Sequence, residues 1–484
     1  MKISISYPPV LSCKGVPLVT QNRQFQWFSD PTFIYPVVPA SAATLLKKEG
    51  FEVIWDDAIA MAVPYDTWLS NTRKAASDII VVEAKTPVIK SYWKTINQIK
   101  EALPGTRVVL MGDHVTAFPR ESLENSMADY VITGGDYDFS LLSIARKIRS
   151  GGGGELEPGI YYRENGNIVN TGPFELKHDL DSLPMIDRDL TRWDLYAFKN
   201  GNFKRTPGTY IMSGRDCWWG RCSFCSWTTI YPKFRKRSVR SVIDEIGHLI
   251  ERHGIREIMD DTGTFPVGPW LREFCNEMIE RGYNRKISLD INMRLADSVD
   301  LDDMKLMKRA GFRLVLVGIE SANDSTLMRI NKGTTLDEIK KNLCNLKKAG
   351  LFPHITIMFG YPWESYEQSK NTLEFGKYLL RKNLAYTMQA TIVIPYPGTP
   401  LFRQCRENGW LLTEDWDLYD MRGPVMNSEG CEKEIMNFAQ ELYRVSFHPE
   451  FLARKLLSIR DLDDLKYFMR AGKKVLGHIF DFKG

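Results

Sequence analysis

Three cysteines in the middle of the chain are the residues whose type and spacing point most directly to chemistry. Cys217, Cys222 and Cys225 stand in the sequence Cys-Trp-Trp-Gly-Arg-Cys-Ser-Phe-Cys. Three thiolates at this density can hold an iron–sulfur cluster and leave one iron without a protein ligand. A metal site with an open coordination position usually performs chemistry, whereas a site closed by four ligands usually supports structure. The loop at 217–225 therefore predicts a reactive metal centre.

Structural zinc and thiol–disulfide exchange are the two alternatives for this loop. Zinc fingers and ribbons need four ligands, usually as two separated pairs. His248 and His253 lie on or just beyond the next predicted helix, but no second Cys-x-x-Cys follows. A thioredoxin-type motif would use Cys222 and Cys225 alone and would leave Cys217 unexplained. An iron–sulfur cluster accounts for all three cysteines.

Length and charge bound the class of the protein. At 484 residues the chain exceeds one ordinary domain, so two or three domains with separate cores are expected. Its 64 basic and 60 acidic residues leave a net charge of +4, which gives no general reason for a nucleic-acid partner. A short basic run, Lys-Phe-Arg-Lys-Arg at 233–237, is better explained as a solvated loop leading into a helix. No nucleic-acid partner is therefore predicted.

The ends and the cysteine usage predict a cytoplasmic protein. The first residues alternate like a strand and run into Pro8 and Pro9, without the apolar core and cleavage site of a signal peptide. No apolar stretch reaches the ~20 residues that span a bilayer. The remaining cysteines are scattered along the chain. This usage is typical of a reducing compartment, where clustered cysteines bind metal more often than they cross-link.

Residues 1–150 are predicted to form a doubly wound, Rossmann-like α/β domain. Short apolar segments alternate there with helical patterns, such as those at 40–49 and 92–102. The expected strands are Lys2–Ser6, Glu52–Trp55, Asp78–Val82, Arg107–Met111 and Tyr130–Thr133. Ligands of such sheets bind beyond the carboxyl ends of the strands. The candidate binding region is therefore the set of loops at 7–10, 83–87, 112–116 and 134–136.

Four consecutive glycines at 151–154 mark a boundary, because such a tract is too flexible for an element interior. Residues 151–205 are expected to form a linker with a hairpin at Ile160–Arg163 and Asn167–Asn170.

Residues 206–425 alternate strand and helix patterns again, which predicts a partial (β/α)6 barrel of the TIM type. The expected strands are Thr209–Met212, Glu257–Met259, Lys286–Ile291, Leu314–Ile319, His354–Phe359 and Gln389–Ile394. The expected helices are Val239–Arg252, Trp270–Arg281, Leu301–Arg309, Leu336–Ala349 and Tyr366–Leu380. Reactive groups of such barrels gather at the carboxyl ends of the strands, and the cysteine loop follows the first strand. Residues 426–484 are expected to be a helical C-terminal region.

With these features the chain resembles radical SAM enzymes that carry an N-terminal cobalamin-binding domain. In that family three cysteines bind a [4Fe–4S] cluster, and the fourth iron takes the amino and carboxylate groups of S-adenosylmethionine (SAM). Reductive cleavage of SAM gives a 5′-deoxyadenosyl radical. The gap between the first two cysteines is usually three residues but is four here. A bulge is therefore expected at 219–220, where Gly220 supplies the unusual backbone conformation.

Polar residues after successive strands resemble the SAM-binding motifs of the family. Asp260-Asp261-Thr262 follows the second strand, where the family places groups against the SAM amino group, and Asn292-Met293-Arg294 follows the third. The segments at 360–364 and 395–400 resemble the family's Gly-x-Pro-Gly-Glu motif and Pro-Gly-Thr turn. The SAM-binding set implied by the resemblance is Phe224, Asp261, Thr262, Asn292, Arg294 and Glu320. Taken singly, an acid at a strand end is more often solvated, and Arg294 is equally compatible with a surface cation.

The resemblance covers nearly the whole chain and implies that the first domain binds cobalamin. The residues assigned to cobalamin are Pro9, Thr86, Gly112, His114, Thr116 and Asp136. Mutase-type domains ligate cobalt from below through Asp-x-His-x-x-Gly, whereas Asp113 and His114 are adjacent here. No histidine ligand to cobalt is therefore predicted. The alternative is a degenerate domain that only scaffolds the barrel.

The leading hypothesis is a cobalamin-dependent radical SAM methyltransferase that acts on an unactivated carbon through the adenosyl radical and methylcobalamin. One alternative keeps the cofactors but leads to cyclisation, oxidation or rearrangement, as in the tetrapyrrole cyclase branch that the chain also resembles. Another is a non-catalytic cobalamin-binding or redox-sensing protein. A small-molecule or lipid-like substrate and an electron donor such as flavodoxin or ferredoxin are expected. No residue is assigned as catalytic base or radical relay.

The C-terminal stretch Leu465–Phe480 reads as a basic amphipathic helix. Such a helix can lie on a membrane surface, which would suit a lipid-like substrate. More often it packs its apolar face against its own domain, and this is the favoured interpretation.

Overall fold

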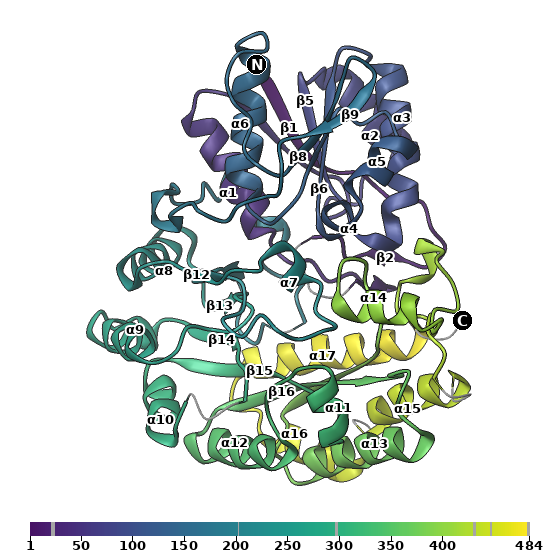
Figure 1. The fold of residues 1–484 in the computed structure, drawn as a ribbon. Helices are drawn as coiled ribbons and strands as arrows, with labels where there is room; N and C mark the ends of the chain where they lie inside the picture. Colours follow the sequence, from purple (N-terminus) through teal and green to yellow (C-terminus); the bar gives the residue numbers. More distant parts are fainter. Residues whose placement is uncertain (21–24, 202, 296–298, 429–431, 446–447, 482–484) are drawn as a thin grey trace.

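The computed structural model describes the chain except residues 21–24, 202, 296–298, 429–431, 446–447 and 482–484 (Figure 1). Two sheets dominate the described part, one of seven strands and one of six. The first sheet lies at the top of Figure 1 and the second below it, with the cysteine segment between them. The loops of both sheets therefore meet in the middle of the molecule.

The first sheet has the strand order of a doubly wound fold, which confirms the prediction. Its order is β4-β1-β5-β6-β7-β8-β9, and the pairs from β4 to β7 are parallel. The parallel strands are β1 (Lys2–Tyr7), β4 (Glu52–Asp57), β5 (Ile79–Glu83), β6 (Arg107–Met111) and β7 (Tyr130–Ile132). The chain steps to one side of β1 and then to the other, so a topological switch point lies beside β1. Ligands of such sheets bind at the carboxyl ends next to that point.

Helices cover both faces of this sheet. The helices α1 (Val37–Lys48) and α6 (Tyr137–Arg149) lie on one side of it in Figure 1. The helices α2 (Tyr65–Ala75), α3 (Ile89–Ala102) and α5 (Pro119–Asn125) lie on the other side. Every residue of β5 is buried, as expected of a strand that is covered on both faces.

The predicted hairpin is confirmed and joins the edge of this first sheet. Strands β8 (Ile160–Glu164) and β9 (Asn167–Asn170) pair antiparallel, and β8 pairs antiparallel with β7. The hairpin lies within the range predicted as a linker, yet it extends the sheet of the first domain.

The second sheet is the predicted partial barrel. Its strands are β10 (Gly208–Ile211), β13 (Glu257–Asp260), β14 (Ser288–Asn292), β15 (Phe312–Glu320), β16 (Phe352–Phe359) and β17 (Thr387–Ile392). They pair in chain order and all in parallel, with β10 and β17 at the two edges. The helices that follow the strands are α8 (Val239–His253), α9 (Pro269–Glu280), α10 (Leu301–Arg309), α12 (Leu336–Ala349) and α13 (Tyr366–Arg381). Parallel strands in chain order direct all their carboxyl ends to one rim, where the cysteine loop begins.

The C-terminal region is helical and packs against the rest of the chain. It consists of α15 (Glu432–Val445), α16 (Pro449–Leu457) and α17 (Leu462–Asp481). Tyr467 on α17 is buried against Leu314 and Tyr386 of the barrel, and Lys474 donates to the carbonyl oxygens of Asp30 and Pro31. The interpretation that this helix packs on its own protein is thus confirmed. In the described residues, no helix has both the length and the apolar character needed to cross a membrane.

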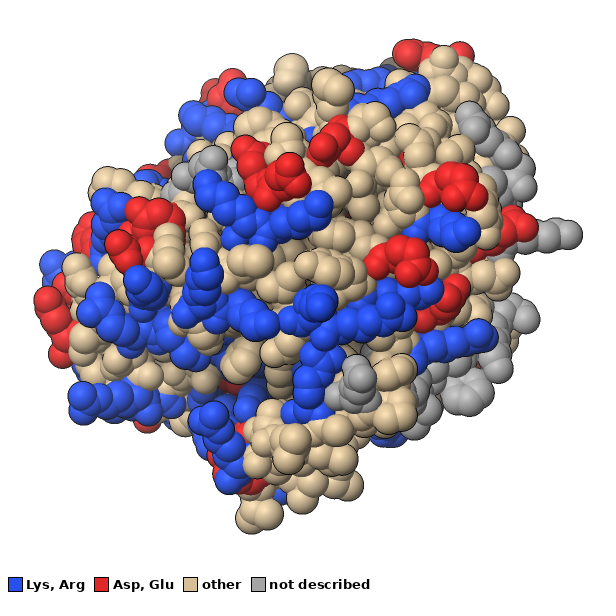
Figure 2. All heavy atoms as spheres, turned by 90° about the horizontal axis from the view of Figure 1, so that it is seen from below, with Lys and Arg blue, Asp and Glu red and all other residues tan. Residues whose placement is uncertain are grey.

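Lys and Arg side chains gather on the face of the barrel that is seen from below in Figure 2. Helices α12 and α13 lie on this side of the molecule in Figure 1. Their exposed basic residues are Lys341, Lys347, Lys348, Lys370, Arg381 and Lys382. The chain carries a net charge of only +4, so this face is a local excess of positive charge.

Candidate active site

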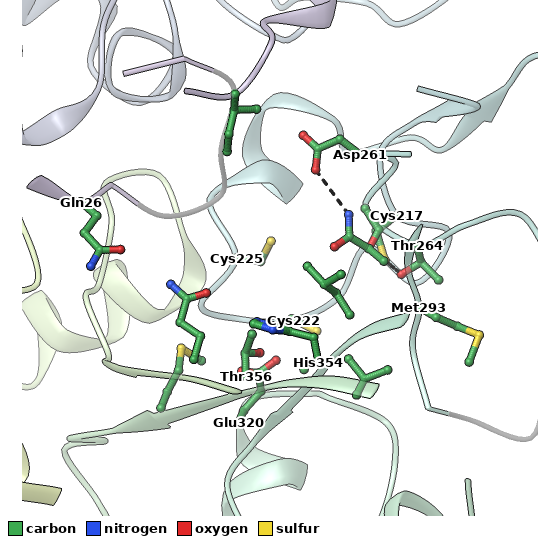
Figure 3. A pocket seen from close by; sticks show the side chains of 18 of the residues that line it. Gln26, Cys217, Cys222, Cys225, Asp261, Thr264, Met293, Glu320, His354 and Thr356 are labelled. Atoms are coloured by element: carbon green, nitrogen blue, oxygen red, sulfur yellow. Dashed lines mark hydrogen bonds between the residues drawn. The ribbon is translucent and has the colours of Figure 1, made fainter. Parts of the chain in front are cut away.

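The three cysteines line one cavity between the two sheets. Cys217, Cys222 and Cys225 are half-buried and free of disulfides, and all three line a cavity of about 420 Å³ (Figure 3). The loop that carries them leaves the barrel after β10 through the short strand β11 (Gly214–Arg215). The predicted convergence of the three thiols on one site is therefore present in the fold.

The donor set of this cavity fits an iron–sulfur cluster better than a single ion. Within the described residues, no three His, Cys, Asp or Glu side chains are grouped as one metal ion would need. The three cysteines line one cavity, and cysteine thiolates are the usual ligands of iron–sulfur clusters. His248 and His253 contact each other edge-to-face in the α8 region and do not line the cavity. The zinc alternative thus lacks the further ligands that it needs.

The extra residue in the first cysteine gap forms the expected bulge. Gly220 has φ +57°, a left-handed conformation that residues with a Cβ rarely adopt. The bulge turns the Trp219 indole onto Gly333, where any Cβ would overlap the ring. The Arg294 guanidinium lies 3.9 Å from the centre of the same ring, and the indole N–H donates to the Asn331 carbonyl oxygen at 2.9 Å. The contacts of Trp219 therefore hold the bulge in one conformation.

Glu320 and Lys332 form a buried ion pair beside the cysteines. Glu320 ends β15 with φ +67°, and its Oε1 lies 2.6 Å from Lys332 Nζ. Burial lowers the pKa of Lys332, but the neighbouring Glu320 carboxylate outweighs it and the pKa is raised. Burial raises the pKa of the Cys222 thiol, and the Lys332 charge opposes that rise. The Lys332 charge therefore offsets only part of the effect of burial, and the pKa of Cys222 stays above its usual value.

Sequence reasoning missed Lys332. The available signal was the Asn-Lys-Gly sequence at 331–333, which is typical of a turn and follows the short helix after Glu320. That turn brings the lysine back to the strand end, a contact that only the folded chain displays.

The Asp-Asp-Thr segment at the end of β13 contributes one residue to the cavity lining and two residues that hold the strand ends in place. Asp261 lines the cavity, and the Asn292 amide donates to it at 3.3 Å. Asp260 accepts from the backbone of Ser213 and Thr262, and burial raises its pKa to about 6. Thr262 is fully buried and its hydroxyl oxygen accepts from the Gly214 N–H at 2.9 Å. These contacts tie the first two strand ends together beneath the cysteine loop.

Five of the six residues assigned to SAM line the cavity, namely Phe224, Asp261, Asn292, Arg294 and Glu320. The sixth, Thr262, lies behind the wall. Thr264 was not predicted, and its hydroxyl lies 3.1 Å from Cys217 Sγ. Arg294 directs its guanidinium at the carbonyl oxygens of Lys332 and Gly333.

None of the residues assigned to cobalamin lines the cavity. His114 is fully buried, and its ring nitrogens lie 3.3 Å from Thr86 Oγ1 and 3.0 Å from Glu121 Oε2. Asp136 is bound by Arg215 and Arg235 at the contact with the barrel. Thr116 donates to the Gly112 carbonyl oxygen, and Pro9 is half-buried. The wall of the cavity on this side comes from an N-terminal segment, through Leu18, Gln26, Phe28, Thr32 and Ile34.

The cavity continues into the barrel, where its lining is mostly neutral. His354 and Thr356 of β16 project into it (Figure 3), and Gln389 of β17 also lines it. Burial and the charge of Arg313 lower the pKa of His354 to about 4, so its ring is neutral near pH 7. Tyr467 of α17 also lines this cavity. An uncharged substrate moiety would therefore meet hydrogen-bonding groups without having to neutralise a charge.

Comparison with known proteins agrees with this geometry. Residues 211–376 match the model of the radical SAM superfamily. An uncharacterized methyltransferase of Pyrococcus horikoshii is 27% identical over 88% of this chain and 90% of its own length. The anaerobic magnesium-protoporphyrin IX monomethyl ester cyclase of Cereibacter sphaeroides is also 27% identical, over 88% of this chain and 70% of its own.

Two solved structures have a similar fold. The cobalamin-dependent S-adenosylmethionine radical enzyme OxsB superposes with a TM-score of 0.70 at 14% identity, over 98% of this chain and 71% of its own. The radical S-adenosylmethionine methyltransferase TsrM of Kitasatospora setae superposes with a TM-score of 0.66 at 16% identity, over 84% of this chain and 75% of its own. Residues 211–376 form a radical SAM domain, and the chain is a radical SAM enzyme. Its two-sheet fold is that of the cobalamin-dependent enzymes of the superfamily, as the sequence predicted.

Proposed function

We propose that this enzyme is a cobalamin-dependent radical SAM methyltransferase that methylates an unactivated carbon of a small molecule. The observation that carries the proposal is the cavity itself, where three thiols without a disulfide, Asp261 and the Glu320–Lys332 pair meet at the strand ends of a radical SAM barrel. Relatives that are named methyltransferases support methyl transfer, among them the uncharacterized methyltransferase of Pyrococcus horikoshii. When bound, the [4Fe–4S] cluster with SAM supplies a carbon radical and cobalamin carries the methyl group.

The residues of the chain then act by binding and by excluding water. Cys217, Cys222 and Cys225 hold the cluster, and the lysine of the Glu320–Lys332 pair provides a cation for a carboxylate. Asp261 accepts hydrogen bonds from an ammonium group. The neutral interior around His354 receives the substrate, and α17 with the N-terminal segment closes the cavity to solvent.

Residues 1–150 are the proposed cobalamin-binding domain, with 151–205 as linker, 206–425 as barrel and 426–484 as helical region. The loops assigned to cobalamin lie at the carboxyl ends of the first sheet, where doubly wound folds bind their ligands. The N-terminal segment that follows β1 lines the cavity and therefore stands between that sheet and the cysteines. This placement supports cobalamin binding next to the cluster. A cytoplasmic location and reduction by a flavodoxin or ferredoxin complete the proposal.

The proposal is tested by anaerobic reconstitution with iron, sulfide and hydroxocobalamin, followed by SAM, a reductant and a metabolite extract. Methyl transfer predicts 5′-deoxyadenosine, S-adenosylhomocysteine and a product heavier by one CH2 unit in mass spectrometry. Cys222→Ala is expected to abolish SAM cleavage. The matched control is Cys344→Ala, which changes a half-buried free cysteine outside the cavity and is expected to keep it. Cobalt bound well below one atom per chain would contradict the cobalamin assignment.

Cyclisation or oxidation without methyl transfer is the second candidate. It is favoured by the similarity to the tetrapyrrole cyclase, which equals that to the methyltransferase of Pyrococcus horikoshii. Formation of 5′-deoxyadenosine without S-adenosylhomocysteine, and a product without the added CH2 mass, would decide for this candidate.

A further inference from the structure

The turn at 330–333 carries an unusual backbone. Asn331 and Gly333 both have positive φ, +55° and +63°, and they flank Lys332. A non-glycine residue in the left-handed region is uncommon and costs conformational energy unless its surroundings hold it. Here the surroundings are the cysteine loop and Arg294, which take up every carbonyl oxygen of the turn.

Four successive carbonyl oxygens of this turn accept hydrogen bonds from the site. The Ser223 N–H, inside the cysteine loop, donates to residue 330 at 3.0 Å. The Trp219 indole donates to residue 331 at 2.9 Å. Arg294 donates to the carbonyl oxygen of residue 332 from both Nε, at 3.2 Å, and Nη2, at 2.7 Å. Its Nη2 also donates to the carbonyl oxygen of residue 333. The turn is thus fastened along its whole length to the loop that carries the cysteines.

Trp219 and Arg294 form one stacked unit, which we call the clamp. The guanidinium lies 3.9 Å from the ring centre, and a Cβ added at Gly333 would overlap both the ring and the Arg294 Nη2 atom. A planar guanidinium stacked on an aromatic ring keeps its N–H groups free to donate in the ring plane. Trp219 reaches this position because the cysteine gap has four residues and bulges at Gly220.

The residue held by the clamp is Lys332. Its Nζ lies 2.6 Å from Glu320 Oε1 and 5.8 Å from the centre of the Phe224 ring, inside the cysteine loop. We propose that the Trp219–Arg294 clamp positions the Lys332 ammonium at the cluster end of the cavity, and that the extra residue in the cysteine gap serves this purpose. Trp219 and Arg294 are therefore positioning residues. The inference rests on the proposed function, since its readout is SAM bound beside the cluster.

The test compares SAM binding to reconstituted, cluster-loaded variants. Trp219→Ala and Arg294→Gln are each expected to weaken SAM binding about tenfold, the size expected from displacing one charge-assisted contact. Lys332→Met is expected to weaken it at least as much. Because the clamp acts through the lysine, Trp219→Ala should add little in a Lys332→Met background. The electron paramagnetic resonance spectrum of the reduced cluster on SAM addition gives a second readout besides activity.

Trp218→Ala is the matched control, since this neighbouring indole N–H has no partner within the described structure and its ring is 5.7 Å from the Arg294 guanidinium. It is expected to leave SAM affinity near wild type. Should Trp219→Ala fail to take up the cluster, Trp219→Phe decides, because it keeps the stack and removes only the N–H; a weakening of a few-fold is expected.

Two outcomes would overturn the inference: unchanged affinity in the clamp variants, or fully additive effects of Trp219→Ala and Lys332→Met. Failure of the proposed function is distinct: without radical SAM chemistry the cluster-loaded wild type would bind no SAM at all, and with cyclisation in place of methyl transfer it would bind SAM but form no S-adenosylhomocysteine.

Discussion

The contact between the two sheets depends on one buried arginine, and replacing Arg215 by methionine tests it. Arg215 stands two residues before Cys217. Its Nη1 lies 2.9 Å from Asp136 Oδ1, and its Nη2 lies 2.5 Å from Asp138 Oδ2. The side chains of Arg215 and Asp136 are each 6% exposed and that of Asp138 is 0% exposed, so water cannot take the place of the arginine when it is removed. Removing one member of such a buried ion pair costs ~3–5 kcal/mol, because the remaining charge is left uncompensated.

Arg235 moderates this cost at one of the two acids. Its Nη2 lies 2.6 Å from Asp136 Oδ1, so Asp136 keeps a cation when Arg215 is replaced. The uncompensated group is Asp138, which is why the expected loss in the free energy of unfolding stays at the lower end, ~3 kcal/mol. The double variant Arg215→Met/Asp138→Leu removes both charges and is expected to recover part of this loss.

Urea unfolding of the apoprotein at pH 7 measures the effect, with hydrogen exchange of β7 and the cysteine loop to locate it. The control is Arg192→Met, which removes a bidentate arginine–aspartate pair of similar geometry at the surface, where the two side chains are 47% and 50% exposed. Exposed pairs contribute ~0–1 kcal/mol. If Arg215→Met costs no more than Arg192→Met, or if the double variant is worse than both single ones, the buried pair does not hold the two sheets together.

Three further predictions concern pH, packing and the cysteine loop. Burial raises the pKa of Glu83 to about 7 from its usual 4.5, so the folded state binds the proton more tightly than the unfolded state. The free energy of unfolding should therefore fall as the pH rises from about 4.5 to about 7. Glu83→Gln should flatten the dependence of the unfolding free energy on pH in this range, unlike Glu52→Gln at the surface. Tyr467→Ala should cost ~3 kcal/mol in thermal unfolding because it opens a cavity under α17, whereas Met469→Ala, 69% exposed, should change stability by less than ~0.5 kcal/mol. Gly220→Ala should cost ~1 kcal/mol and slow cluster uptake, because φ there is +57°, and a smaller loss on substitution by asparagine would agree. The pH prediction is contradicted if Glu83→Gln and Glu52→Gln have the same pH dependence. The packing prediction is contradicted if Tyr467→Ala and Met469→Ala lose the same stability. The loop prediction is contradicted if Gly220→Ala keeps wild-type stability and cluster uptake.

Local patterns in the sequence were enough for the elements and for the reactive loop. The helix Leu301–Arg309 and the strand Arg107–Met111 lie where periodicity predicted them, because one-sided or complete burial leaves a repeat of 3.6 or a continuous apolar run. The cysteines at 217–225 could be recognised as a candidate metal site from the sequence because their spacing is short and cysteines are rare. Gly220 was identified as the bulge from the extra residue alone, since only glycine adopts that conformation at little cost.

Contacts between distant segments were decided by tertiary structure alone. Asp136, which the sequence assigns to cobalamin, binds Arg215 and Arg235, and both arginines are far from it in sequence. Lys332 reaches the site only because a turn returns it to the end of β15. Such pairings leave no period in the sequence, since each depends on how two sheets dock. The chain by itself thus determined which elements form and which loop is the candidate metal site, whereas the docking of those elements determined which charged side chains surround that loop.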